Sequence, residues 1–538
     1  MKSCRTLLLA FMAFLTSVFA FADQGHHETL GSEQLGSVSF PTSCAANVQK
    51  PFERGVALLH SFWYEEAEKQ FAEVAKNDKG CAMAYWGIAM SWYHQHWDRP
   101  DAGVLKRGAG ELAKARSLAT KATAREKEYI AALTKFYSDS KQDHLARAAA
   151  YSAAMRQLYR DHPDDYEAGA FFALSLLASE PPHDATFANR KEAIPILNEL
   201  FAKNPDHPGM AHYLIHSCDK PQLAEQGLAA ARRYAQIAPS SPHALHMPSH
   251  IFARLGLWDE DIKSNIASVK ATREATAMHM GGGGHQVHAM DFLVYAYLQT
   301  GQEDEAAKLV DEVQKISVDS HDVMAGMLDY GRAQFPATYA LELHHWSDAL
   351  ALQPAPGATP VNRAITNQAR AIGAGHLGDA GTIERAARDF EADLAAAKQH
   401  STAYVATNLD NAHDIVLAWL AFTKKDITEA LRLMRSAADR QDAAGEEGGG
   451  TPAREMLADM LMQLKRPQEA LAEYEVVMKN NPNRFNAIYG AAQTAELAQQ
   501  QEKANGYYTQ LVKLCGPDTR SSRPELATAK AKTLMARK

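Results

Sequence analysis

The stretch His212-Tyr-Leu-Ile-His216 recurs 34 residues further along the chain as His246-Met-Pro-Ser-His250. A fixed period of this length is typical of proteins built from stacked copies of one helical hairpin. Around both copies, apolar residues recur at spacings of three and four, which indicates amphipathic helices. Short breaks that carry Gly, Pro or Asn-Pro separate the helical segments. Because no segment requires a strand, the sequence predicts an all-α fold.

A small residue followed four positions later by an aromatic one marks the second helix of several hairpins. The pair is Ala67 with Phe71 in one place and Ala470 with Tyr474 in another, and the second pair recurs 34 residues later. In these features most of residues 50–515 resembles the tetratricopeptide repeat family. The resemblance implies a right-handed α-solenoid of about eight to ten hairpins, although several loops are longer than the family pattern.

Two further stretches carry a closer resemblance. Cys81-Ala-Met-Ala-Tyr-Trp-Gly87 and His243-Ala-Leu-His-Met-Pro-Ser-His-Ile-Phe252 look like segments of a group of exported bacterial tetratricopeptide repeat proteins. No activity is established for that group. The resemblance therefore implies fold and export, and it leaves the chemistry open.

The first 22 residues have the pattern of a secretory signal peptide. Lys2 and Arg5 precede an almost wholly apolar run over residues 7–19, and Ala20-Phe21-Ala22 fits the small-residue cleavage rule. The apolar run is too short to span a bilayer as a helix, which takes about 20 residues. The sequence predicts a periplasmic or secreted protein, cleaved after Ala22, with no membrane span in the mature chain.

The rest of the chain divides into three parts by composition. Residues 23–45 are polar and aperiodic, so we expect a flexible lead-in. Residues 46–444 are predicted to form the solenoid that contains the histidine-rich groove. A Gly-rich segment, 445–450, then precedes residues 451–538, which are predicted to form a C-terminal pair of repeats and a tail.

Export would permit disulfides, and the mature chain keeps Cys44, Cys81, Cys218 and Cys515. Cys44 and Cys81 flank a single predicted hairpin, so its geometry can bring their side chains together. We expect a disulfide between them. Cys218 and Cys515 are far apart in sequence and are expected to remain free thiols.

Composition narrows the classes of partner. Hydrophobic residues make up 46% of the chain and charged residues 22%, as in a folded globular protein. The formal net charge is -8, and no long stripe of Lys and Arg is present. Such a balance gives no electrostatic basis for holding a phosphate backbone, so we expect no nucleic-acid partner.

Nine of the 23 histidines lie within the 82 residues from His207 to His288. In a tetratricopeptide hairpin, the first helix lines a concave groove, and its positions 2, 5 and 9 face that groove. Spacings of three and four keep these side chains on one face of a helix. In repeat register, three successive first helices thus present to a ligand groove His212, His216, His243, His246, His250, His288, Asp291 and Tyr295.

The spacing His-x-x-x-His lets two imidazoles on one helix share a metal ion. A third ligand from the next helix would complete a zinc site of catalytic type, with one open position. Imidazole also suits copper. If a cofactor is present, we therefore expect zinc or copper, with candidate ligands His212, His216, His246, His250, His288 and Asp291.

Other interpretations remain open. The groove histidines can hydrogen-bond to a peptide, a protein segment or a small molecule, with their protonation tuning the affinity, or they can serve only in packing. The zinc-protease motif His-Glu-x-x-His is absent, so a hydrolase would need a general base from elsewhere, such as Asp291 or Glu180. The sequence favours an exported scaffold that binds a ligand in its groove, with a metal-dependent enzyme as the alternative.

Overall fold

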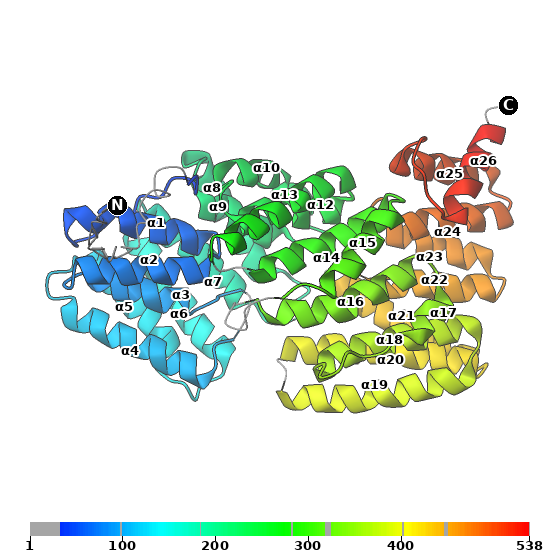
Figure 1. Cartoon of the computed structure of the whole chain (residues 1–538), viewed down its shortest axis with the longest axis horizontal. Helices are drawn as coiled ribbons and strands as arrows, with labels where there is room; N and C mark the ends of the chain where they lie inside the picture. Colours follow the sequence, from blue (N-terminus) through cyan, green and yellow to red (C-terminus); the bar gives the residue numbers. More distant parts are fainter. Residues whose placement is uncertain are drawn as a thin grey trace, which may run out of the picture. The chain divides into compact units, whose positions relative to one another are not determined.

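The computed structural model describes residues 33–536 except 97–98, 183, 281–282, 318–323, 401–402 and 446–449. This part of the chain contains helices α1 to α26, a short 3-10 turn over Ala46–Val48 and no strand (Figure 1). The predicted all-α class is therefore confirmed. The predicted signal peptide, residues 1–22, lies outside the described residues, as do residues 23–32 of the lead-in.

The helices of the first half are α1 (Gln49–His60), α2 (Tyr64–Asn77), α3 (Ala82–Ser91), α4 (Ala102–Leu118), α5 (Ala124–Tyr137), α6 (His144–Asp161), α7 (Tyr166–Ala178), α8 (Ala188–Lys203), α9 (Pro208–Cys218), α10 (Ala224–Ile237), α11 (Pro242–His246), α12 (Pro248–Leu255) and α13 (Trp258–Ala277).

The helices of the second half are α14 (Gly283–Gln299), α15 (Glu303–Val313), α16 (Gly326–Glu342), α17 (Trp346–Ala351), α18 (Pro360–Leu377), α19 (Ala380–His400), α20 (Ala403–Thr423), α21 (Ile427–Ala444), α22 (Ala453–Gln463), α23 (Pro467–Asn480), α24 (Phe485–Leu497), α25 (Gln501–Cys515) and α26 (Pro524–Ala536).

Successive helices pack in pairs, and each pair contacts the next, as in an α-solenoid of tetratricopeptide type. The pairs run from α1 with α2 to α24 with α25, and in one of them the first helix is split into α11 and α12, both packed on α13. The described helices form more such pairs than the about eight to ten hairpins that the sequence predicts, because several loops depart from the 34-residue spacing and obscure the repeat boundaries.

The signature aromatic residues explain why certain positions are glycine. A Cβ atom added to Gly87 of α3 would lie 2.4 Å from the ring of Phe71 of α2. The equivalent pair near the carboxyl end behaves alike, because a Cβ at Gly490 would lie 2.3 Å from the ring of Tyr474. In both places the aromatic ring occupies the space that a side chain of the next hairpin would need, so only glycine permits this close packing.

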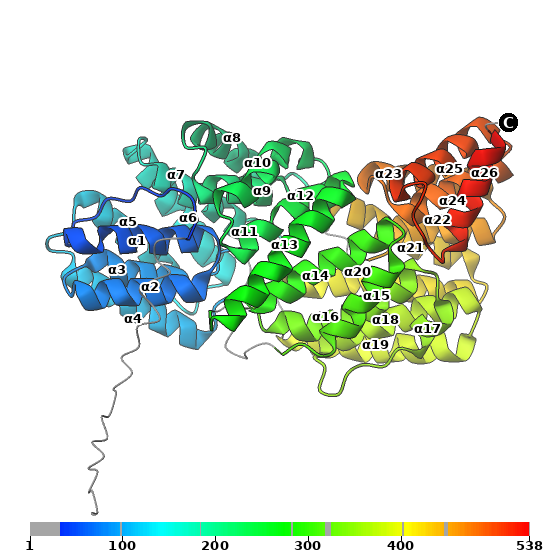
Figure 2. The same cartoon turned by 45° about the horizontal axis from the view of Figure 1, so that its top comes forward.

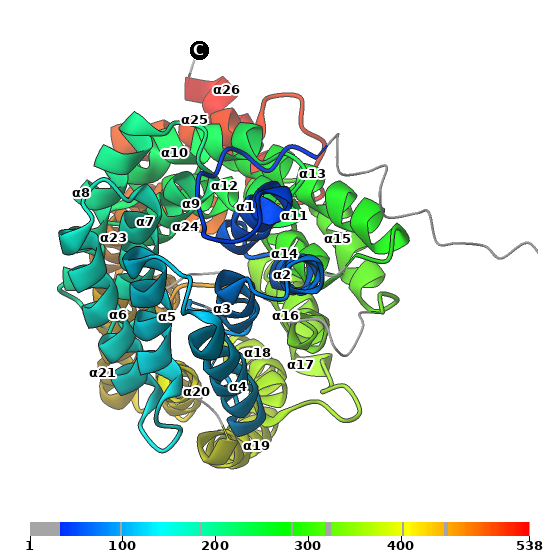
Figure 3. The same cartoon turned by 90° about the vertical axis from the view of Figure 1, so that its left-hand side faces the viewer.

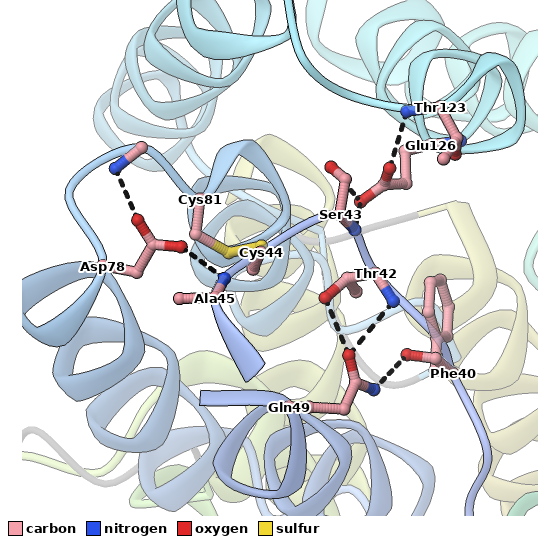
Figure 4. Close-up of a disulfide and its surroundings, with 11 residues drawn as sticks. Phe40, Thr42, Ser43, Cys44, Ala45, Gln49, Asp78, Cys81, Thr123 and Glu126 are labelled. Atoms are coloured by element: carbon pink, nitrogen blue, oxygen red, sulfur yellow. Dashed lines mark hydrogen bonds between the residues drawn. A yellow bond between two sulfur atoms is a disulfide. The ribbon is translucent and has the colours of Figure 1, made fainter. Parts of the chain in front are cut away.

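Residues 35–45 make buried contacts that the sequence pattern did not indicate. Phe40 is fully buried, and its ring lies 4.9 Å from that of Tyr129. The predicted disulfide between Cys44 and Cys81 is present and joins this segment to the start of α3 (Figure 4). Beside it, the Asp78 carboxylate accepts a hydrogen bond from a backbone N–H of the segment at 2.8 Å.

The other two cysteines of the predicted mature chain form no disulfide. Cys218 and Cys515 are buried free thiols.

Arg484, which directly precedes α24, is fully buried and donates to Glu342 of α16 and to Glu455 of α22. Helices before and after segment 445–450 thus share one buried ion network. Among the described residues, no helix combines the length and apolar character needed to cross a membrane.

Local sequence sets where the histidine-bearing helices begin and break. Pro208 and Pro242 occupy the first turns of α9 and α11, where a missing N–H costs nothing. The side chains of His207 and Ser241 accept backbone N–H groups at these two starts. Pro248 cannot donate to the preceding turn, and it separates α11 from α12 within the second His-x-x-x-His copy.

Candidate metal centre

Three neighbouring first helices carry the histidines. Helix α9 contacts α12, and both α11 and α12 contact α14 (Figure 2). On its other side α9 contacts α1 (Figure 3). We define triad 1 as His212, His216 and His243, and triad 2 as His246, His250 and His288. Within each triad, one ring nitrogen of every histidine lies within 4.8 Å of the others.

The structure thus groups six of the eight residues that the sequence places in the groove. The other two belong to neither triad and make hydrogen bonds with other residues. Asp291 accepts a hydrogen bond from the hydroxyl of Tyr330 at 3.4 Å. Tyr295 accepts one from Arg484 at 2.6 Å, and its ring packs on that of Trp258.

The triads are covered rather than exposed along an open groove. His212 is fully buried, and the exposed fraction of every other triad member except the half-buried His288 is at most 6%. Phe62 covers triad 1, with its ring centroid 4.3 Å from that of His212. Phe292 covers triad 2, with its ring centroid 4.9 Å from that of His246. These phenylalanines pack directly against the imidazoles, and only His288 and Phe292 retain partial exposure to water.

The hydrogen bonds of His246 fix where its proton lies. The amide nitrogen of Asn265 donates to the backbone and the carboxylate of Asp261, at 3.1 and 2.9 Å, so the amide oxygen must be an acceptor. That oxygen lies 2.6 Å from Nδ1 of His246. Nδ1 therefore donates, and Nε2 of the neutral ring carries a lone pair.

His250 has the same tautomer for a different reason. Its Nδ1 lies 2.9 Å from a carboxylate oxygen of Asp219, whose other oxygen accepts a hydrogen bond from Arg254 at 2.8 Å. A carboxylate paired with a guanidinium is ionised and only accepts, so Nδ1 of His250 donates. When the ring is neutral, its Nε2 carries the lone pair.

The two Nε2 atoms face each other. Nε2 of His246 and Nε2 of His250 are 3.0 Å apart, which is hydrogen-bond distance. When both rings are neutral and protonated on Nδ1, neither has a proton to donate here, and a cation between the two nitrogens would remove the repulsion. When His250 is charged beside Asp219, its Nε2 donates to His246 instead. Burial holds the pKa of His246 well below its usual range, and neighbouring histidines lower it further, so the His246 ring itself is neutral.

His288 supplies the third imidazole from α14. Its ring centroid is 4.4 Å from that of His246 and 5.7 Å from that of His250. Its Nδ1 is buried and has no hydrogen-bond partner among the described residues. Burial lowers the pKa of His288 to about 3, with His250 and His285 adding to the effect. The ring is therefore neutral at pH 7 and able to act as a ligand.

Triad 1 has a related but less constrained arrangement. Nδ1 of His212 donates to the backbone oxygen of His60 at 2.6 Å, so Nε2 of His212 is an acceptor. Nε2 of His243 lies 3.1 Å from it, and a proton on His243 makes this an ordinary hydrogen bond. The buried Nε2 of His216 has no hydrogen-bond partner among the described residues. Burial lowers the pKa of His212 to about 3.

A third cluster of similar composition lies next to triad 1. In the His–Glu–His cluster, defined as His60, Glu167 and His207, both histidines donate from Nε2 to the Glu167 carboxylate, at 2.7 and 3.0 Å. Their Nδ1 atoms accept hydrogen bonds from the Tyr213 hydroxyl and the Met210 backbone. Every ring nitrogen is satisfied, so this cluster has no lone pair available for a metal.

Sequence reasoning did not identify the His–Glu–His cluster. His60 and Glu167 are 107 residues apart, and no local spacing connects them. His207 was counted as the first histidine of the histidine-rich stretch but was given no role there.

Comparisons with known proteins add little about this centre. No family model and no curated protein matches the chain. Among solved structures, the human IFIT1 dimer with PPP-AAAA is 12% identical over 81% of this chain and 91% of its own, with a TM-score of 0.38. The TPR domain of P58(IPK) is 13% identical over 85% of this chain and all of its own, with a TM-score of 0.21. Similarity this low says nothing about the site.

Proposed function

We propose that this helical-repeat protein binds a transition-metal ion at triad 2. The observation that carries the proposal is the pair of Nε2 atoms of His246 and His250, which face each other at 3.0 Å while the Nδ1 atom of each ring donates to a separate acceptor. In a tetrahedral zinc site with Zn–N bonds near 2.0 Å, neighbouring ligand nitrogens are about 3.3 Å apart. The two histidines are therefore already close to the separation that a bound ion requires.

The partners of the ligands support the same function. A metal-binding histidine commonly donates its other ring N–H to a carboxylate or an amide oxygen, which fixes the tautomer and the ring orientation. Asp219 does this for His250, and Asn265 does it for His246. Triad 2 thus combines ligands and orienting partners, whereas a histidine that serves only in packing needs no such tautomer.

The ligand chemistry narrows the choice of ion. Neutral imidazoles suit zinc and copper, whereas magnesium and calcium require oxygen ligands. Neither Asp291 nor any thiolate belongs to triad 2. Zinc and copper are therefore the ions we propose, held by three protein ligands with one position left open.

The alternatives from the sequence find less support. Five of the six triad histidines are buried, which leaves only the half-buried His288 for direct contact with a peptide or small molecule. An open ligand position also suits a metal-dependent enzyme, but both candidate bases are engaged elsewhere. Glu180 is paired with Arg190 at 2.9 Å, and Asp291 accepts from a tyrosine. Metal binding is therefore the function we propose, without a reaction.

We place this function in an exported protein. The disulfide between Cys44 and Cys81 is compatible with an oxidising compartment, where such bonds persist. The signal pattern over residues 1–22 agrees with that location. Amino-terminal sequencing of the protein from a periplasmic or secreted fraction should begin at Asp23. A chain that retains Met1 and remains in the cytoplasm would contradict export.

Metal titration of the mature chain tests the proposed function. The protein is purified without a polyhistidine tag, stripped with a chelator, and titrated with Zn(II) or Cu(II) in competition with a chelator of known affinity. We expect uptake that His250→Asn reduces, because asparagine can still donate to Asp219 but has no Nε2 ligand. His207→Asn is the matched control, since His207 is also buried beside a carboxylate and asparagine is a good helix cap.

Two outcomes would overturn the proposal. One is the absence of uptake of either ion by the stripped wild-type protein. The other is equal uptake by His250→Asn and the wild type, with both folded by circular dichroism.

A further inference from the structure

We infer that triad 1 holds a second metal ion, and that the two triads form one centre of two neighbouring ions. The inference rests on the proposed function of triad 2 and extends it to the adjacent histidines. Three observations support it: the nitrogens available in triad 1, the equivalence of the two triads in sequence, and the short distances between them.

The available nitrogens come first. Nε2 of His212 is an acceptor, because its Nδ1 proton is donated to the backbone oxygen of His60. It faces Nε2 of His243 at 3.1 Å, so a metal ion would take the place of the proton between these two nitrogens. Nε2 of His216 is buried and has no hydrogen-bond partner among the described residues, and His216 is only 4% exposed. A buried nitrogen without a partner is costly unless something else occupies its lone pair. A metal ion shared with His212 and His243 would do so.

The two triads are also equivalent in the repeat. In each, a His-x-x-x-His pair on one first helix supplies two ligands, and the two pairs are 34 residues apart. In each, the third ligand comes from the start of the following first helix: His243 on α11 for triad 1 and His288 on α14 for triad 2. A site that binds metal in one repeat thus has a counterpart with the same ligand types in the preceding repeat.

The triads lie side by side. His243 and His246 are one turn apart on the five-residue helix α11, with ring centroids 6.0 Å apart, yet they belong to different triads. The rings of His216 and His250 are 6.1 Å apart. These distances resemble the 6.3 Å between His216 and His243 inside triad 1. Ions held by such closely spaced rings are near enough to interact.

Copper is the probe that tests both parts of the inference. The stripped, untagged protein is loaded with Cu(II), the bound copper per chain is measured, and electron paramagnetic resonance spectra are recorded. We expect two Cu(II) per chain and a spectrum that is broadened or weakened by coupling between the ions. His216→Asn and His250→Asn should each bind one Cu(II) and give the sharp spectrum of an isolated ion.

The outcomes separate this inference from the proposed function. One Cu(II) per chain that is lost in His250→Asn and kept in His216→Asn would overturn the inference alone. Two Cu(II) with spectra of isolated ions would overturn the neighbouring arrangement. Failure to bind any ion would overturn both proposals. If His216→Asn does not fold, His243→Asn removes another ligand of triad 1, and its stoichiometry decides the question.

Discussion

The His–Glu–His cluster and triad 2 use the same residue type in similarly buried places, yet they offer opposite chemistry. In the cluster, one carboxylate accepts protons from two histidines, and each remaining nitrogen accepts a hydrogen bond. In triad 2, separate acceptors bind the outward nitrogens of His246 and His250, and the inward nitrogens face each other at 3.0 Å. The position of the acceptor, inside or outside the group of rings, thus separates a cluster that we expect to stabilise the fold from one that we propose as a metal site.

The largest expected effect comes from removing the acceptor inside the His–Glu–His cluster. Glu167→Ala leaves two buried N–H donors without a partner, so we expect a loss of about 3–5 kcal/mol of unfolding free energy. Urea unfolding of the metal-free wild type and variant measures this difference in unfolding free energy. Glu192→Ala, which breaks the partly exposed pair with Arg156, should cost only about 0–1 kcal/mol.

Metal uptake by Glu167→Ala gives a second test of the same comparison. Folded Glu167→Ala should retain metal at triad 2, since Glu167 contacts none of its ligands. Lost uptake with an unchanged free energy of unfolding would reverse the roles we assign to the two groups.

Metal loading should stabilise through triad 2 and not through the His–Glu–His cluster. At a free Zn(II) concentration of 100 times the dissociation constant, one site raises the unfolding free energy by about 2.7 kcal/mol. His207→Asn should keep this increment, and His250→Asn should lose the part contributed by triad 2. Thermal or urea unfolding with and without Zn(II) measures the difference. An increment that is lost in His207→Asn instead would assign the ion to the other cluster.

A smaller effect is expected from the orienting partner of His246. Asn265→Ala removes the acceptor that fixes its tautomer, so metal affinity should fall about 10–100-fold. The matched control is Ser264→Ala, because Ser264 is the neighbour on α13 and donates to the backbone of α11 instead of to a histidine. Competition titration with a chelator distinguishes the variants. Equal affinity in both would show that the tautomer of His246 is fixed without Asn265.

The smallest effect is a pH dependence in the His–Glu–His cluster. Burial alone would raise the pKa of Glu167, but His207 and His60 outweigh it and hold the pKa below its ordinary value. The stabilising charge is therefore fully present above the unfolded pKa of about 4.3 and is lost as the pH falls below it, by at most about 1.4 kcal/mol per pH unit.

Glu167→Gln tests this sign because it lacks the titrating group. The difference in unfolding free energy between wild type and variant should be constant from pH 5 to 7 and should narrow below about pH 4.3. A difference that widens in acid would contradict the lowered pKa.

The fold was largely predictable from the sequence. The 34-residue period and the aromatic residues Phe71 and Tyr474 are local features that recur, and each has the packing role that the repeat implies. The number of hairpins was less accessible, since several loops are longer than the family pattern and obscure the repeat boundaries. The contacts of Phe40 depend on tertiary packing, and its polar surroundings in sequence do not indicate them.

The site was predictable only where its residues share a helix face. Repeat register placed the triad histidines together because positions 2, 5 and 9 fall on one side of successive helices. It could not place Asn265, which belongs to the second helix of its hairpin, or Phe62, which reaches the centre from the first hairpin. Phe292 could have been predicted from the sequence, since it follows His288 by four residues and therefore lies on the same face of the helix.

Both triads combine histidines from two successive repeats, which limits how many repeats can contribute to the centre. Each triad has two histidines from its own repeat and a third from the next repeat, so we expect that no single repeat forms the proposed metal site alone. The series ends at α14, which offers His288 to the repeat before it but carries Asp291 and Tyr295 where the earlier repeats have their histidine pair. Tyr295 instead bonds to Arg484, so the last helix of the series joins the histidine-bearing hairpins to the carboxyl-terminal ones.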